Sequence, residues 1–212
     1  ARELGKLGIT WSCNAKANIP RKTLEVLKAN GLRVLVVGYE SGVQEILNNI
    51  RKGLRLDIIK RFSQDCHELG IVLHGTFILG LPGETRETIK QTLAFAKEVN
   101  PRTLQVSMAA PYPGTELYEQ AIANGWFNKD KELLMKEAGG GWQVAALSYP
   151  DLTSEEIFKG VADFYKAFYF RPSKIAEIVW EMLQDWDMMK RRLREGVEFF
   201  QFLRTRNKAV EC

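Results

Sequence analysis

The chain alternates between short continuous apolar runs and longer segments in which apolar residues recur every three or four positions. Continuous runs are typical of strands in a parallel sheet buried on both faces, and the three-to-four spacing is typical of amphipathic helices. We expect strands at 9–13, 32–38, 71–79 and 103–109, and helices at 20–30, 43–51, 56–69, 85–99 and 115–124. This strict alternation predicts an α/β fold with parallel strands.

Four parallel strands joined by short crossovers occur both in β/α barrels and in open doubly wound sheets. The dinucleotide-binding version of the open sheet has a G-x-G-x-x-G turn entering a helix, with an acid about 20 residues further on. No segment of this chain supplies that pattern. We therefore favour a β/α barrel, or part of one, over residues 1–127, and its chemistry is expected in the loops at the strand C-termini.

The pattern changes after Gly125. Residues 128–152 have the composition of a connector, in which 142–147 resembles one more short strand. Thr153 and Glu156 form a capping-box pattern that opens a helical extension over 153–212. The extension is rich in aromatic residues at helical spacing, and Pro172 interrupts it. Two interpretations stay open: a helical cap packed on the barrel, or an interfacial helix that meets a lipid surface or an apolar substrate.

Composition narrows the class of protein. The 212 residues are 45% hydrophobic and 26% charged, and no run approaches the roughly 20 apolar residues of a membrane span, so we expect a cytoplasmic globular protein. The net charge of +4 is spread over mixed-charge helices, which argues against a nucleic-acid partner. The three cysteines, Cys13, Cys66 and Cys212, are too scattered for a disulfide framework or a metal site, and we expect free thiols.

Two glycine-rich turns follow the central strands and carry the first candidate site residues. In GYESG at 38–42, Glu40 and Ser41 suit a sugar diol, and Gly38 lets the backbone approach a ligand closely. The alternative is that Glu40 caps the next helix. In GLPGE at 80–84, the backbone of Gly80 is expected to meet the edge of a flat heterocycle, between Ile78 and Leu81 as apolar walls.

A tight turn without a ligand is an equal alternative for the second loop, with Thr85 as the N-cap of the helix that follows. Lys16, after the first strand, is either a clamp for a ligand carboxylate or a solvated loop lysine. Residues 109–115 resemble the floor of a pocket. His67 is expected on a helix surface and His74 in the core, and neither has a partner at metal-ligand spacing.

Several of these loops together resemble a known family. The succession GYESG at 38–42, NIRKG at 49–53, FILGLPGE at 77–84 and PYPGTELY at 111–118 is similar to the later half of radical S-adenosylmethionine (SAM) enzymes, in the class with an N-terminal cobalamin-binding domain. The resemblance covers about residues 9–126. Residues 11–18 and 67–84 further resemble the hopanoid-biosynthesis-associated HpnJ group.

The resemblance implies the C-terminal part of a partial (β/α)₆ barrel, in which a [4Fe-4S] cluster reduces SAM to a 5′-deoxyadenosyl radical. It places Glu40, with Gly38 and Ser41, at the ribose and Lys16 at the methionyl carboxylate. A further group is implied to lie under the adenine or beside the substrate: Ile78, Gly80, Leu81 and Pro82 after one strand, and Ala109 and Pro111 after the next. Glu84 stands one residue later than the family's acid and is left as a cap, and catalytic residues stay unknown.

One departure from the family pattern is large. The family holds its cluster with a Cys-x-x-x-Cys-x-x-Cys loop, and this chain has no such triplet. We therefore expect a fragment that is inactive alone, with the cluster ligands and any cobalamin domain in a missing N-terminal part.

For the parent protein, the resemblance implies a radical enzyme that modifies a hopanoid side chain, with an electron donor such as flavodoxin or ferredoxin. It also implies a possible peripheral contact with the inner face of the membrane. Two alternatives stay open, a cobalamin-dependent radical SAM methyltransferase and a non-catalytic SAM-binding module.

Overall fold

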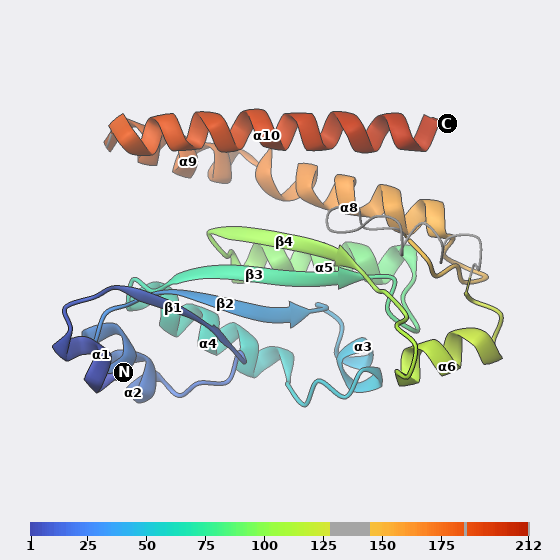
Figure 1. Cartoon of the computed structure of the whole chain (residues 1–212), viewed down its shortest axis with the longest axis horizontal. Helices are drawn as coiled ribbons and strands as arrows, with labels where there is room; N and C mark the ends of the chain where they lie inside the picture. Colours follow the sequence, from blue (N-terminus) through green and yellow to red (C-terminus); the bar gives the residue numbers. More distant parts are fainter. Residues whose placement is uncertain (128–144, 185, 212) are drawn as a thin grey trace.

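The computed structural model describes residues 1–127, 145–184 and 186–211. Four parallel strands form one sheet in the sequential order β1-β2-β3-β4 (Figure 1). The strands are β1 (Trp11–Ala15), β2 (Leu32–Glu40), β3 (Val72–Leu79) and β4 (Thr103–Met108). The helices between and beside them are α1 (Arg2–Lys6), α2 (Arg21–Ala29), α3 (Gln44–Asn49), α4 (Leu56–Glu68), α5 (Arg86–Val99) and α6 (Glu116–Ala123).

The expected elements of the sheet region are all present in the expected order, with every boundary within two residues of the sequence prediction. β1 begins at Trp11 instead of residue 9, and β2 continues through Glu40. Pro20 is the N-cap of α2 and Thr85 is the N-cap of α5, and Gly31 and Gly70 adopt the positive φ expected after a helix. The periodicity and the helix-boundary residues therefore fixed these elements without tertiary information.

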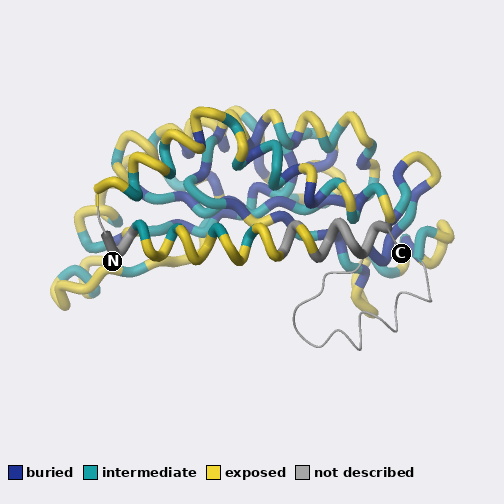
Figure 2. The backbone as a smooth tube through the Cα atoms, turned by 90° about the horizontal axis from the view of Figure 1, so that it is seen from above, coloured by how far each residue is buried: buried dark blue, intermediate teal, exposed yellow. Residues whose placement is uncertain are grey.

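The two faces of the sheet differ. On one face Leu35, Val37 and Tyr39 of β2 are fully buried under helices, whereas Val34 and Val36 on the other face are only half-buried. In Figures 1 and 2, α2, α4 and α5 all lie on one side of the sheet. The expectation of a sheet buried on both faces is therefore wrong for the part of the chain that the structure describes.

The one-sided cover also separates the two candidate architectures. Right-handed crossovers between strands in sequential order place every connecting helix on the same side of the sheet, as on the outside of a barrel. A doubly wound sheet needs a point where the strand order reverses, and the order β1-β2-β3-β4 contains none. The architecture is thus a section of a partial β/α barrel, and the open face of the sheet is the barrel interior.

The helical extension consists of α8 (Ser154–Tyr169), α9 (Pro172–Gln184) and α10 (Trp186–Glu211). The predicted capping box is confirmed, because Thr153 and Glu156 each bond the other's backbone N–H. α9 begins at Pro172, where the sequence predicted an interruption. Most of the predicted connector, residues 128–144, lies outside the described residues, and Leu147 forms one isolated antiparallel bridge with Phe127.

α8 covers the free edge of the sheet. β4 ends the strand order, so its backbone N–H groups on that edge have no strand partner. The N–H of Val106 donates to the Tyr165 hydroxyl at 2.9 Å, and the N–H of Leu104 donates to the Tyr169 hydroxyl at 3.0 Å. Both tyrosines come from α8, so this helix protects the edge strand by hydrogen bonds as well as by packing.

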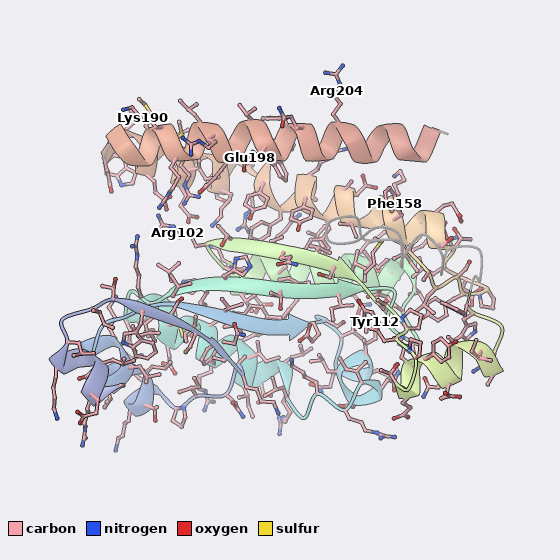
Figure 3. The ribbon with its side chains drawn as sticks, viewed as in Figure 1. Arg102, Tyr112, Phe158, Lys190, Glu198 and Arg204 are labelled. Atoms are coloured by element: carbon pink, nitrogen blue, oxygen red, sulfur yellow. The ribbon has the colours of Figure 1, made fainter. Side chains whose placement is uncertain are left out.

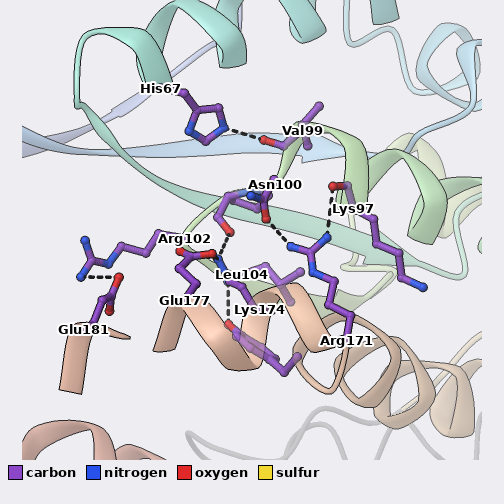
Figure 4. A network of polar contacts seen from close by, with 12 residues as sticks. His67, Lys97, Val99, Asn100, Arg102, Leu104, Arg171, Lys174, Glu177 and Glu181 are labelled. Atoms are coloured by element: carbon purple, nitrogen blue, oxygen red, sulfur yellow. Dashed lines mark hydrogen bonds and ion pairs between the residues drawn. The ribbon is translucent and has the colours of Figure 1, made fainter. Parts of the chain in front are cut away.

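A network of polar contacts attaches the start of α9 to the end of α5 and to the loop that leads into β4 (Figure 4). Arg171 donates to the Lys97 carbonyl at 3.1 Å and to the Asn100 side chain, and its guanidinium lies 4.4 Å from the centroid of the Phe168 ring. The Lys174 side chain is only 1% exposed, and burial lowers its pKa. Its ammonium donates to the Pro101 carbonyl at 3.2 Å and to the Glu177 carboxylate at 2.9 Å. The negative charge of Glu177 compensates the buried positive charge of Lys174.

A chain of ion pairs continues from this network to α10. Arg102 pairs with Glu181 of α9 at 2.8 Å, and Glu181 pairs with Arg192 of α10 at 2.7 Å. In Figure 3, Arg102 points from the start of β4 toward α9 and α10, while Arg204 projects outward from the far side of α10. No helix in the described part of the chain is long and apolar enough to cross a membrane.

We predict that Tyr165→Phe and Tyr169→Phe each lower the free energy of unfolding by about 1 kcal/mol, because each leaves an edge-strand N–H without its protein partner. Tyr112→Phe is the matched control, since Tyr112 is 62% exposed in a loop. Urea titrations followed by circular dichroism measure the three values. Equal stability of all three variants and wild type would show that solvent replaces the tyrosine hydroxyls at no cost.

Candidate functional site

A hollow of about 530 Å³ lies on the open face of the sheet toward the strand C-termini. It is lined by Asn14, Ala15 and Lys16 from the end of β1, Val36 and Gly38 from β2, and Thr76 from β3. Three consecutive strands therefore contribute to one site. The structure places Lys16 and Gly38, two of the predicted site residues, in the same hollow, and the Lys16 side chain is exposed.

Glu40 lies beside this hollow. An irregularity in the pairing of β2 with β3 between Gly38 and Glu40 leaves Glu40 on the open face, with a left-handed φ of 62°. Its Oε1 accepts a hydrogen bond from Lys52 Nζ at 2.6 Å, and both side chains are less than one fifth exposed. A Cβ at Gly38 would lie 2.4 Å from that oxygen, so the carboxylate rests against the Gly38 backbone.

The alternative that Glu40 caps the following helix is not what the structure has. The N-cap of α3 is Val43, which makes no side-chain capping bond. Ser41 is fully buried, its hydroxyl bonds Thr92 Oγ1 at 3.1 Å, and it accepts from the Val43 N–H at 3.2 Å. The structure thus brings Glu40 to the hollow and uses Ser41 to anchor the loop to α5.

In the Gly80–Glu84 turn, the backbone N–H and carbonyl of Gly80 are already hydrogen-bonded to side chains of the protein. The Gly80 N–H donates to Glu84 Oε2, and the Gly80 carbonyl accepts from the Tyr149 hydroxyl at 2.8 Å. A Cβ at Gly80, where φ is 82°, would lie 3.1 Å from Ile157 of α8. A glycine at position 80 allows close packing against α8. We expected the Gly80 backbone to meet a flat heterocycle, but its N–H and carbonyl are hydrogen-bonded within the protein.

Glu84 closes this turn instead of capping α5. The residue is 3% exposed, and burial raises the pKa of its carboxyl to about 7 although the backbone N–H groups of Gly80 and Leu81 favour the charged form. Glu84 Oε1 has no hydrogen-bond partner among the described residues. Burial next to this carboxyl also raises the pKa of Tyr149. Glu84 is therefore a buried acid whose protonated form is favoured by burial, compared with an exposed glutamate.

The other predicted site residues divide between the open face and the buried loops. Ile78 is half-buried on the open face, two residues beyond Thr76. Leu81, Ala109 and Pro111 are buried where β3 and β4 end, and Pro82 is half-buried. Of these, Ile78 shares the face of the hollow, whereas the buried residues support the loops behind it.

The two histidines occupy different surroundings. His67 is exposed on the surface of α4, as expected, and its Nε2 lies 2.9 Å from the Val99 carbonyl of α5. His74 is half-buried on the open face of β3, where burial lowers its pKa and its Nδ1 lies 2.8 Å from Thr103 Oγ1. The expectation of a core histidine is wrong, because His74 alternates in phase with Thr76 and Ile78, a signal already present in the sequence.

The described residues do not fit an iron–sulfur cluster. They contain no group of three or more His, Cys, Asp or Glu side chains placed to hold a metal ion. Cys13 is exposed, and Cys66 is buried in α4, where burial raises the pKa of its thiol to about 12. The Cys66 thiol therefore lacks the lowered pKa of a metal-binding cysteine.

Comparisons with known proteins agree with this fold. Residues 1–96 match the family model of the radical SAM superfamily. The chain is 32% identical over 180 residues, 82% of its length, to an uncharacterized methyltransferase of Pyrococcus horikoshii. It is 25% identical over 80% of its length to cytidylyl-2-hydroxyethylphosphonate methyltransferase of Streptomyces wedmorensis. It spans 37% and 33% of these two relatives, about a third of their lengths.

Solved structures support the architecture. Coproporphyrinogen III oxidase from Escherichia coli, a radical SAM enzyme, superposes with a TM-score of 0.53 over 74% of this chain and 32% of that protein, at 20% identity. Methylornithine synthase superposes with a TM-score of 0.52 over 76% of this chain and 39% of that protein, at 14% identity. These superpositions show that the fold is that of the radical SAM barrel. The family match supports a relationship of residues 1–96 to the radical SAM superfamily.

We predict that Glu84 makes stability depend on pH. Between about pH 4.5, the usual pKa, and about pH 7, the folded chain keeps a proton that the unfolded chain has released, so the free energy of unfolding falls as pH rises. Glu84→Gln removes this dependence. Relative to wild type, the variant should gain about 3 kcal/mol between pH 4.5 and pH 8.

Urea titrations at the two pH values measure this gain. Glu25→Gln, at a half-exposed glutamate of α2, is the control and should show no comparable change. A Glu84→Gln variant whose difference from wild type is the same at both pH values would contradict the raised pKa.

Proposed function

We propose that this chain is the SAM-binding part of a radical SAM methyltransferase of the cobalamin-dependent class. The observation that carries the proposal is the hollow where Lys16, Gly38 and the neighbouring Glu40 converge from adjacent strand ends. The likeness to a methyltransferase over 82% of the chain supports the type of reaction. In this superfamily SAM and a [4Fe-4S] cluster are the cofactors, and reductive cleavage of SAM supplies a 5′-deoxyadenosyl radical.

The residues of the hollow fit the parts of SAM. Neighbouring strands are about 4.8 Å apart, so the ends of β1, β2 and β3 span roughly 10 Å, a length comparable to a nucleoside. The exposed Lys16 ammonium provides a cation for the methionyl carboxylate. Glu40 provides carboxylate oxygens for ribose hydroxyls, and Ile78 provides an apolar surface on the same face for the adenine.

The remaining parts of the enzyme are assigned to the rest of a longer protein. The chain spans about a third of its methyltransferase relatives, and its described residues do not fit the cluster. We therefore assign the cluster ligands and a cobalamin-binding domain to an N-terminal part, and reduction of the cluster to a flavodoxin or ferredoxin. Within this chain, the hollow binds and orients SAM.

We predict that the chain binds SAM and that Glu40→Ala weakens binding about tenfold, since hydrogen bonds to a charged group are lost. Lys16→Ala should weaken SAM binding by a similar factor and leave adenosine binding unchanged, because adenosine has no carboxylate. Asp57→Ala, at an exposed ion pair with Arg55 on α4, is the control.

Isothermal titration calorimetry of the 212-residue chain provides these affinities. Absence of SAM binding, or equal weakening by all three variants, would rule out the assigned pocket.

A second candidate is the modification of a hopanoid side chain by an enzyme of the HpnJ group, working at the inner face of the cytoplasmic membrane. A second hollow, of about 340 Å³ between α8, α9 and α10, favours it. Its lining is mainly apolar and aromatic, including Tyr165, Tyr169, Phe170, Phe199 and Phe200. Such a lining suits a polycyclic lipid.

Exposed apolar residues continue from this hollow along α9 and α10. They are Ile175, Val179, Trp180, Leu183, Leu193, Val197 and Phe200. Their three- and four-residue spacing places one apolar stripe on each helix, as in helices that lie on a lipid surface. The side chain of Phe202, in the same segment, lies outside the described part of the structure.

We predict that the double variant Trp180→Ser, Phe200→Ser lowers sedimentation with phosphatidylglycerol vesicles about tenfold, because the two side chains are 65% and 60% exposed and apolar. Ile58→Ser on α4, at a side chain 42% exposed, is the matched control. Unchanged partitioning of the double variant would remove the lipid surface from this candidate function.

A further inference from the structure

The loop after α3 returns a lysine to the open face of the sheet. α3 ends in a Schellman motif, in which the Lys52 N–H donates to the Leu47 carbonyl and the Arg51 N–H donates to the Asn48 carbonyl, both at 2.9 Å. Arg51 occupies the left-handed position of the motif with φ 52°, where glycine is usual. This turn directs Lys52 back toward the end of β2, and its Nζ reaches Glu40 Oε1 at 2.6 Å.

Backbone strain is concentrated at this contact. Among the described residues, only Glu40, Arg51 and Asn100 are non-glycine residues with positive φ. Two of the three belong to the loops that bring Glu40 and Lys52 together. Left-handed conformations of such residues persist where the surrounding structure holds them, and they gather at functional sites.

Gly38 completes the arrangement. A Cβ at this position would lie 2.4 Å from Glu40 Oε1 and 3.0 Å from Lys52 Nζ, so any other residue would displace the pair. The contact has a definite orientation, because Lys52 donates to one carboxylate oxygen of Glu40, Oε1. The other oxygen, Oε2, makes no hydrogen bond within the part of the chain that the structure describes. Side chains that are 17% and 19% exposed hold this geometry better than a solvated surface pair does.

The pair also sets the charge of the hollow. Glu40 alone would oppose an anionic ligand group next to Lys16. The ammonium of Lys52 compensates the negative charge of the Glu40 carboxylate. Lys16 is then the charged residue among those that line the hollow. A ligand that carries both a diol and a carboxylate can then place its diol at Glu40 and its carboxylate at Lys16. The Glu40 carboxylate, compensated by Lys52, does not repel the ligand carboxylate.

We propose that Lys52 is a positioning residue that holds Glu40 so that Oε2 accepts hydrogen bonds from the vicinal hydroxyls of a ribonucleoside. This inference rests on the proposed SAM-binding role of the hollow. The inference gives a role in the site to Lys52 of the NIRKG loop, for which the sequence alone suggested none. It also assigns the discrimination between ribose and a deoxygenated sugar to the Glu40–Lys52 pair. Lys52 acts through Glu40 and does not itself contact the ligand.

The test compares adenosine with 2′,3′-dideoxyadenosine by isothermal titration calorimetry on the 212-residue chain. Wild type should bind adenosine about tenfold more tightly, since only adenosine supplies hydroxyls to a charged acceptor. Lys52→Met should lower this ratio to about one or two, and Lys52→Arg should restore most of it. Lys60→Met, which breaks the exposed pair of Lys60 with Glu98, should keep the wild-type ratio.

The ratio separates positioning from general damage, because a poorly folded variant loses affinity for both nucleosides together, and thermal melting reports its folded fraction. A wild-type ratio in Lys52→Met overturns the role of Lys52 while the proposed function stands. A wild-type chain that binds neither nucleoside nor SAM overturns the proposed function. A wild-type ratio near one, with SAM bound, overturns the assignment of ribose recognition to the pair.

Discussion

The structure depends on helices covering only one face of a parallel sheet. Leu35, Val37 and Tyr39 are buried against that layer, and Phe77 stacks on Tyr39 with ring centroids 5.4 Å apart. Because every crossover is right-handed and the strand order is sequential, no connecting helix reaches the other face. That face stays accessible at the strand ends, and the hollow with Lys16 lies there. The same constraint that builds the core therefore creates the candidate site.

The two glycine-rich turns divide the work at the strand ends. The loop after β2 presents a functional group, because Gly38 leaves room for the carboxylate of Glu40 and for Lys52. The loop after β3 is occupied with its own architecture, because Glu84 and Tyr149 bond Gly80 and α8 packs on it. Two glycine-rich turns of similar sequence thus differ in what they contact: the loop after β2 lies at the hollow, and the loop after β3 packs against the helical extension.

The extension is tied to the sheet by contacts of two kinds. Tyrosine hydroxyls from α8 satisfy the edge of β4, and charged groups join α9 and α10 to the start of the same strand. Such contacts are directional, so they fix position more strictly than apolar packing alone. They hold the aromatic hollow between the three helices in a defined position relative to the barrel section.

The sequence by itself determined the elements and their order and pointed to the radical SAM superfamily, since hydrophobic periodicity, glycine and proline positions and loop motifs are local properties. It also predicted Lys16, Gly38 and Glu40 as site residues, and the structure places them in or beside one hollow. Only the tertiary structure decided that one face of the sheet is open, that Ser41 anchors a loop, and that Lys52 meets Glu40 from 12 residues away. These outcomes depend on which face of the sheet the helices cover and on which distant loops approach a residue, and local pattern does not encode either.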